Sequence, residues 1–248
     1  MTPTEDEPGL RRDARRNREQ LITAARELFA ERGVDVPLEE IARRARVSIG
    51  TLYNRFPTRG HLVDAVFADR VAASVRIAEA ALDMDDPWQA LVLLLEQTCE
   101  LQAADLGYND VVSRALPLRG AAEQARARGY ELMRQVIVRA QEAAVLRADI
   151  TLEDMAFVLW GHARTVEATA AVAPRAWRRH LAIMLDGLRA EAAHPLPEPP
   201  LRPDQARQAL SGQCAAEHDE PRAPGDGGPL SRPPGRQGRA HYDAEQQS

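Results

Sequence analysis

Apolar side chains in this 248-residue chain recur every three or four positions in nearly every segment between Arg11 and Glu191. That spacing places them on one face of an α-helix. One such face contains Leu21, Ile22, Ala25, Leu28 and Phe29. The alternating apolar and polar runs with hairpin turns that are typical of β-sheets do not occur. The sequence therefore predicts an all-α fold, and its length suffices for a sizeable core.

Helix boundaries are predicted from capping residues and from proline. Gly33 is a C-cap for the first helix, and Pro37 begins a short second one. Ser48 is an N-cap for a short helix that Pro57 ends, and Thr58 caps a long helix over about 59–81. Further helices are expected near residues 87–105, 109–115, 119–146, 151–172 and 175–191.

Charge is distributed unevenly along the chain. Residues 11–60 contain twelve arginines and seven acidic residues, a net charge of +5, although the whole chain carries -5. A basic segment on an acidic body indicates a local polyanion-binding face. The alternative is an arginine-rich helix that is merely solvated.

Several classes of function are not supported by any motif. The two cysteines, Cys99 and Cys214, are too few for a disulfide framework or a zinc site, and the histidines have no metal-ligand spacing. No nucleophile elbow, zinc-protease motif, phosphate-binding loop or dinucleotide turn is present. No apolar run reaches about 18 residues, and residues 1–10 lack the apolar core of a signal peptide. We expect a cytoplasmic protein without enzymatic activity, metal, cofactor or membrane partner.

Both ends of the chain are predicted to be disordered. Residues 1–10 form an acidic, polar leader. Ten of the seventeen prolines lie between residues 195 and 234, and residues 193–248 contain no Ile, Val, Phe or Trp. Such a segment cannot bury enough apolar surface to offset the loss of chain entropy. A transient helical turn is possible over residues 204–211.

Residues 38–62, LEEIARRARVSIGTLYNRFPTRGHL, are the most informative stretch for function. They contain two short helices joined by a tight turn and the start of a third. Ser48 and Thr51 suit phosphate oxygens, Asn54 suits a base or a phosphate, and Gly50 allows close approach. Thr58 and Arg59 lie at the start of the next helix, whose amide groups favour a phosphate.

The stretch resembles the DNA-binding domain of TetR-type bacterial transcriptional regulators. The resemblance rests on AARELFAERG at 24–33, IARRA at 41–45, VSIGTLYNRF at 47–56, and Arg59 with Leu62. LAIMLDGLRA at 181–190 is similar to the last helix of many members. The resemblance implies a three-helix helix-turn-helix head over residues 11–58 and a helical ligand-binding and dimerisation body over residues 59–192.

In that family the positions that match six residues of the head commonly contact DNA: Ser48, Ile49, Thr51, Tyr53, Asn54 and Arg59. With Gly50 and Thr58 they form the expected DNA-binding set. Two residues depart from the family pattern. Arg46 stands where glycine is usual, which costs on the order of 1 kcal/mol if φ is positive there. Arg59 replaces the usual lysine and still suits a phosphate.

The body is expected to dimerise and to hold a ligand. The interface is predicted at Phe157, Trp160, Gly161, Leu181, Leu185 and Leu188, unless these helices pack only within one chain. Arg164 either pairs with Glu167 or faces a ligand anion. The candidate ligand contacts mix apolar and polar groups, as small-molecule sites do: Cys99, Tyr130, Met133, His162 and Arg164.

The resemblance implies a sequence-specific transcriptional regulator that binds a palindromic operator in double-stranded DNA as a homodimer. Repression relieved by a small-molecule effector is the expected behaviour. The alternative is a DNA-binding regulator whose body only dimerises or binds a protein, without an effector.

Overall fold

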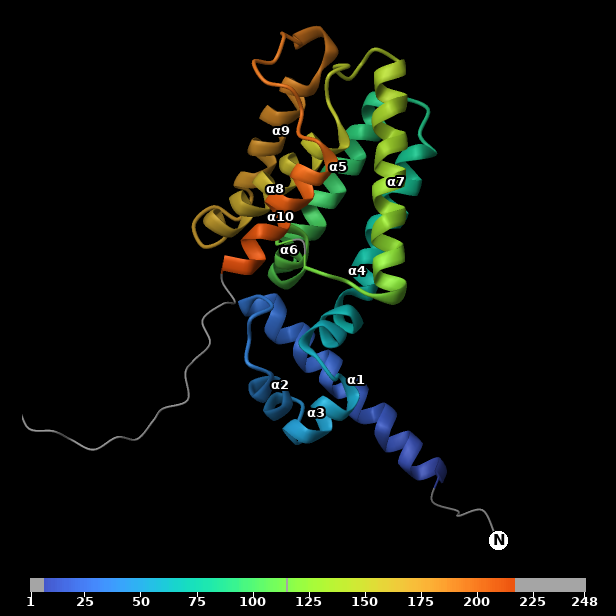
Figure 1. Ribbon diagram of the computed structural model, residues 1–248, viewed down its shortest axis with the longest axis vertical. Helices are drawn as coiled ribbons and strands as arrows, with labels where there is room; N and C mark the ends of the chain where they lie inside the picture. The colour runs from blue at the N-terminus through green and yellow to red at the C-terminus, as the bar shows by residue number, and fades with distance from the viewer. Residues whose placement is uncertain (1–6, 115, 217–248) are drawn as a thin grey trace, which may run out of the picture. The chain divides into compact units, whose positions relative to one another are not determined.

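The computed structural model describes residues 7–114 and 116–216, and in these residues it contains helices and no strand. The predicted all-α fold is confirmed, and the chain path is shown in Figure 1. The helices are α1 Glu7–Arg32, α2 Leu38–Arg44, α3 Ile49–Arg55, α4 Arg59–Leu82, α5 Pro87–Ala103, α6 Leu106–Ser113, α7 Gly120–Glu142, α8 Leu152–Thr169, α9 Ala176–Leu188, the 3-10 turn η1 Ala190–Ala192, and α10 Pro203–Ala216.

The head is built from α1, α2 and α3, whose inward side chains share one core. Leu21, Phe29, Ile41 and Leu52 are completely buried in it. Val47 is partly buried against the same core. The apolar face that the sequence predicted for α1 therefore holds the two shorter helices in place.

Two tight turns set the course of the chain through the head. Gly33 ends α1 with φ +77°, and its N–H donates to the carbonyl of Phe29 at 2.8 Å, as expected for a C-cap. Arg46 ends α2 with φ 57°. That is the left-handed conformation for which glycine is favoured, so Arg46 holds the same turn at a cost in backbone energy.

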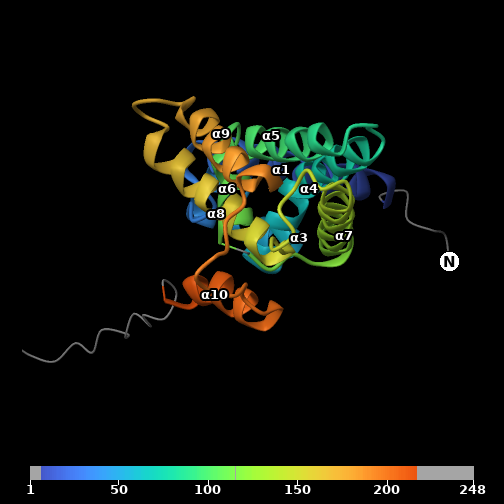
Figure 2. The same cartoon turned by 90° about the horizontal axis from the view of Figure 1, so that it is seen from above.

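In the body, α4 packs along α7 and α5, as Figures 1 and 2 show from two sides. α8 packs against α5, α6 and α9. The largest fully buried side chains of this second core come from α5, α7, α8 and the segment after α7. They are Leu91, Leu94, Leu95, Leu132, Leu146 and Met155. Within the described residues, no helix is both long enough and apolar enough to cross a membrane.

Helix α6 joins the head to the body. A Cβ atom on Gly107 would lie 2.8 Å from the Cβ of Phe29, so only glycine allows this approach to α1. The ring of Phe29 stacks on that of Phe67 from α4, with 6.0 Å between ring centroids. Phe67 also contacts the ring of Tyr108, which follows Gly107 in α6. Helices α1, α4 and α6 therefore meet at two ring contacts that share Phe67.

Several boundaries differ from those predicted. α6 begins at Leu106, because the Asp105 side chain accepts from the amide of Tyr108 and caps the helix there. α7 ends at Glu142, and Ala144 has φ 54°. α1 already includes residues 7–10, so this part of the predicted leader is helical, and residues 1–6 lie outside the described residues.

The predicted tail differs in the same way. Residues 203–216 form α10, a longer helix than the transient turn expected over residues 204–211. Pro203 opens the helix, where its missing N–H has no intrahelical partner to lose. Ala206 is buried, so this segment does bury some apolar surface. Residues 217–248 lie outside the described residues.

Candidate nucleic-acid interface and body cavity

The start of α3 is fixed by a local hydrogen-bond pair. Ser48 is the N-cap, and its hydroxyl accepts from the amide of Thr51 at 3.1 Å. The hydroxyl oxygens of the two residues also lie 2.9 Å apart. Ser48 therefore caps the helix as predicted, and the two hydroxyl groups lie together near its first turn.

The outward face of α3 gathers most of the residues that the sequence singled out. Leu52 is completely buried below it, and Phe56 is nearly so. The side chain of Tyr53 is 46 % exposed. Ser48, Ile49, Gly50 and Asn54 are also exposed, whereas Thr51 is half-buried. This surface, here called the α3 face, presents hydroxyl, amide and small apolar groups together, which is the chemistry that base edges and phosphates require.

Thr58 caps α4 and lies just after the α3 face. Its hydroxyl accepts from the amide of His61 at 3.4 Å and lies 2.8 Å from the Nδ1 of the same residue. Thr58 is exposed, so the start of α4 is accessible. Free amide groups at a helix start favour an anion. The geometry at Thr58 is compatible with its predicted phosphate contact.

Arg59 makes intramolecular contacts that the sequence did not predict. Its Nη1 donates to the carbonyl oxygens of Val34 and Val36, at 2.5 Å and 2.8 Å. The side chain thus fastens the start of α4 to the turn between α1 and α2. Nη1 of the guanidinium thereby satisfies two buried carbonyl groups of that turn, which need donors.

The basic character of the head is partly neutralised inside the head. Arg44 pairs with Glu27 at 2.8 Å, and Arg32 pairs with Glu40 at the same distance. The hydrogen bond from Arg32 holds the pKa of Glu40 below its usual value. Arg55, in the last turn of α3, is exposed and follows Asn54 directly. Arg55 was not predicted as a DNA contact, although a cation at the end of the α3 face was a usable signal.

The turn after α1 is also held from the body. The amide of Val34 donates to Oδ2 of Asp110 in α6 at 3.0 Å. Arg114, which directly follows α6, pairs with Asp35 at 2.6 Å. Burial raises the pKa of the Asp110 carboxyl group. α6 therefore bonds to the same turn that Arg59 holds.

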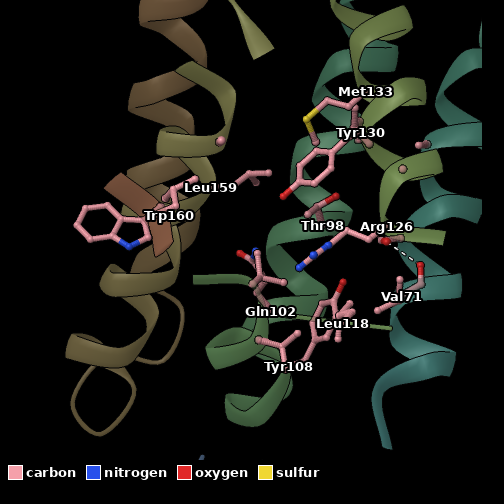
Figure 3. Close-up of a pocket in the computed structure, with 18 residues that line it drawn as sticks. Val71, Thr98, Gln102, Tyr108, Leu118, Arg126, Tyr130, Met133, Leu159 and Trp160 are labelled. Atoms are coloured by element: carbon pink, nitrogen blue, oxygen red, sulfur yellow. Dashed lines mark hydrogen bonds between the residues drawn. The ribbon is translucent and has the colours of Figure 1, made fainter. Parts of the chain in front are cut away.

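A cavity of about 110 Å³ opens among the helices of the body (Figure 3). Helices α4 to α8 supply most of its wall, and Leu210 of α10 contributes to it. The wall is mainly apolar, with a few polar side chains directed into the same space, as small-molecule sites usually are. The lining polar residues are Ser74, Thr98, Gln102, Tyr108, Arg126 and Tyr130.

Two of the five predicted ligand residues, Tyr130 and Met133, line this cavity. The other three do not. Arg164 is exposed and pairs with Glu167 at 2.7 Å, the first of the two alternatives considered for it. Cys99 and His162 are buried in the core. Helical periodicity placed Cys99, Met133 and His162 inward correctly, but it could not separate core from cavity wall, and Arg164 is exposed.

His162 and Cys99 form a structural pair. The Nε2 of His162 lies 3.1 Å from the carbonyl oxygen of Cys99, so that nitrogen carries the proton. The imidazole ring packs edge-on against Trp177. Burial lowers the pKa of His162 to about 4 and raises that of the Cys99 thiol. Both groups are therefore neutral at pH 7.

Gln102 and Thr98 were missed by the sequence analysis. Both lie in α5, one turn apart, and Leu94 precedes them by another turn. Spacing of four residues places all three on one side of the helix, where they line the cavity. Polar residues at an otherwise apolar spacing were the signal that could have identified them.

The predicted dimer residues separate into two groups. Leu181, Leu185 and Leu188 are buried against the chain's own body, so the prediction that they contact a partner is not supported. The regular spacing of these three leucines reflects their packing in the core of the chain's own body. Phe157, Trp160 and Gly161 of α8 remain partly exposed. On α9 the side that faces outward includes Ile183, whose side chain is 58 % exposed.

Comparison with known proteins gives matches over both parts of the chain. The profile of the bacterial regulatory proteins, tetR family, matches residues 21–66. That of the transcriptional regulator SbtR-like C-terminal domain matches residues 86–190. The chain is also 32 % identical over 84 residues to TtgW of Pseudomonas putida, an uncharacterized HTH-type transcriptional regulator. That alignment spans 34 % of this chain and 63 % of TtgW, less than two thirds of the curated relative.

Solved structures of bacterial regulators are also similar to this chain. A TetR transcription regulatory protein from Mycobacterium vanbaalenii is 35 % identical, and the match covers 73 % of this chain and 99 % of that one, with a TM-score of 0.43. The regulator FadR from Bacillus subtilis, solved with stearoyl-CoA, is 16 % identical. Its match covers 71 % of this chain and 99 % of that chain with a TM-score of 0.51, a likeness of fold.

Proposed function

Since the chain belongs to the TetR family of bacterial transcriptional regulators, we propose that it is a repressor whose operator binding is relieved by a small molecule. The observation that carries the DNA-binding part is the α3 face, on which Ser48, Ile49, Gly50, Tyr53 and Asn54 lie exposed together. A short capped helix with small and polar outward residues suits the major groove.

Each residue of this face has a proposed role. Asn54 bonds to a base or a phosphate, and Ile49 contacts a thymine methyl group. Tyr53 bonds to the DNA backbone through its hydroxyl. Gly50 permits close approach. Contacts to phosphate come from Ser48, Thr51, Thr58 and Arg55, whereas Arg59 supports the surface through its bonds to the backbone of residues 34 and 36.

We propose that a homodimer presents two such faces to a palindromic operator, about 34–36 Å apart. The partner surface is assigned to the exposed parts of α8 and α9. Phe157 and Trp160 contact each other edge-on there, with ring centroids 6.5 Å apart. Ile183 is the large exposed apolar residue of α9. Large apolar side chains that remain accessible on the surface favour an interface.

The effector is assigned to the body cavity. Val71, Ser74 and Ala78 of α4 line it, and the same helix begins beside the α3 face. Tyr108 and Val111 of α6 line it too, and α6 bonds to the turn after α1. A ligand that fits one arrangement of these helices better than another shifts the population of head positions. FadR, a protein of this fold, was solved with a bound ligand.

The test is fluorescence anisotropy on duplexes that tile the DNA flanking the gene. We expect one tile to bind at low nanomolar to micromolar concentration with a strong salt dependence. Tyr53→Ala should abolish that binding while the melting temperature stays within error, because the side chain is largely exposed. The matched control is Val172→Ala, at an exposed site in the body. This variant should bind the DNA like the wild type.

The competing function is a regulator whose body only dimerises or binds a protein. The cavity with its inward polar groups favours an effector instead. Operator binding that stays unchanged across a broad library of small molecules would favour the competing function.

A further inference from the structure

One buried side chain in the body cavity has both of its hydrogen-bonding atoms unused. Gln102 has no exposed surface, and within the described residues neither its Nε2 nor its Oε1 has a hydrogen-bond partner. Buried polar atoms in native proteins are normally paired. Gln102 lines the cavity, and Figure 3 shows it around the same space as Thr98, Arg126 and Tyr130. The amide therefore has a donor and an acceptor available to whatever occupies this space.

The charge of the wall limits what that occupant can be. Among the described residues that line the cavity, Arg126 is the only charged one. Its Nη2 donates to Glu123 at 2.5 Å, and its Nη1 donates to the carbonyl of Leu116 at 2.9 Å. The positive charge is thus already balanced outside the lining. Burying an ionised ligand without an opposite charge is costly, so the wall favours a neutral molecule.

The size of the cavity sets a further limit. About 110 Å³ is comparable to an apolar cavity of about 150 Å³ that holds benzene in another protein. Leu94, Leu118, Met133 and Leu159 supply apolar surface around the amide. A ligand of about one ring fills this space.

We propose that Gln102 anchors the effector through two hydrogen bonds, and that the effector is a neutral, ring-sized molecule with a donor and an acceptor on one edge, such as a carboxamide or a cyclic amide. This inference rests on the proposed function, because it assigns the ligand of the same cavity. In the free protein, both amide atoms are buried without a hydrogen-bond partner among the described residues. A ligand gains most affinity if it satisfies both of them, which an amide edge does.

Three probes of nearly equal size separate the requirements. Benzamide offers a donor and an acceptor, acetophenone offers an acceptor only, and benzoate carries a charge. Isothermal titration calorimetry of the full chain should show benzamide binding in the millimolar range or tighter. Benzamide should bind about tenfold more tightly than acetophenone, the cost of leaving one buried group unpaired, and more tightly than benzoate.

The anchor is tested by Gln102→Met, which keeps the length of the side chain and removes both polar atoms. The preference for benzamide over acetophenone should fall to about one. The melting temperature should stay the same or rise, because an unpaired buried amide is lost. Gln97→Met lies in the same helix on its exposed side and should retain the preference of the wild type.

The outcomes distinguish this inference from the proposed function. No binding of benzamide at millimolar concentration, tighter binding of benzoate, or an unchanged preference in Gln102→Met overturns the inference. A lower melting temperature with equal loss for all three probes would show that Gln102 is only a packing residue. If benzamide binds through Gln102 but does not alter operator affinity, the ligand assignment stands and relief of repression does not.

Discussion

The backbone amide of Val34 donates a hydrogen bond to the carboxylate of Asp110, 76 residues later in the chain, at 3.0 Å. Gly33, the preceding residue, has φ +77°. A Cβ atom on Gly33 would lie 2.4 Å from the same carboxylate oxygen. Both the left-handed conformation and the close approach require glycine there. This hydrogen bond joins the turn after α1 to α6.

Asp110→Ala should release the turn after α1. The Val34 amide loses its acceptor, and its hydrogen exchange should accelerate together with that of its neighbours. The free energy of unfolding should fall by about 1–2 kcal/mol. Mass spectrometry of exchange in peptides over residues 33–36 measures the first effect. Asp110→Asn keeps an acceptor oxygen and removes a charge that burial already disfavours, so it should behave like the wild type. Equal rates of amide hydrogen exchange in Asp110→Ala and Asp110→Asn would contradict the role of Asp110 as the acceptor for the Val34 amide.

Arg59→Ala should act mainly on stability. Two carbonyl groups lose a charged donor, which should lower the free energy of unfolding by about 1.5–3 kcal/mol, measured by urea denaturation. The salt dependence of operator binding should hardly change. Arg55→Ala is the comparison, because Arg55 is exposed at the end of the α3 face. It should reduce the salt slope by about 1 and leave stability unchanged. A reduced salt slope and an unchanged stability in Arg59→Ala would instead indicate that Arg59 contacts a phosphate.

Arg46→Gly should stabilise the head. The φ of 57° at this position favours glycine, and relief of the strain should raise the free energy of unfolding by about 0.5–1 kcal/mol. Arg43→Gly, at a helical position in α2, should have the opposite sign. Denaturant midpoints of the two variants report the difference. A destabilised Arg46→Gly would mean that the arginine side chain stabilises the turn.

The stability of the body should depend on His162 at acidic pH. The folded pKa of about 4 lies below the ordinary value of 6.5, so the unfolded chain binds more protons between these values. Stability contributed by the neutral ring is therefore complete above about pH 6.5 and is lost as the pH falls toward 4. The loss from pH 7.5 to pH 5 should be about 2 kcal/mol. His162→Gln should show a smaller loss; an identical loss would assign the acid sensitivity to other groups.

Local chemistry made the head predictable. The caps at Ser48 and Thr58 depend on residues within three positions, and both were predicted correctly. The glycine usual at the position of Arg46 raised the question of a positive φ, which the structure answers with 57°. Proline and glycine likewise marked the ends of α1 and α3. These features depend on side chains and backbone that are neighbours in the sequence.

The body was less predictable because its important contacts join distant segments. Nothing near Asp110 in the sequence indicates that it meets Val34, 76 positions away. The polar Gln102 at an apolar spacing was a signal of a cavity wall, but it could not show which side chains complete that wall. The stripe of Leu181, Leu185 and Leu188 has the spacing of an interface, but equally that of an internal core, and the structure shows the second. Arg59 was predicted to contact a phosphate. Its bonds to the carbonyl groups of Val34 and Val36 were not predicted, because those residues lie 25 and 23 positions away in the chain.

The continuity of α4 has a mechanical consequence. The helix runs unbroken from Arg59 to Leu82, and Ser74 contributes to the cavity wall. Ser74 is fifteen residues from Arg59, which corresponds to about 22 Å along a helix axis. A tilt of only about 5° about Ser74 would carry the start of α4 through about 2 Å. A slight adjustment around a small ligand in the cavity can therefore move the start of α4 far enough to break hydrogen bonds to the DNA.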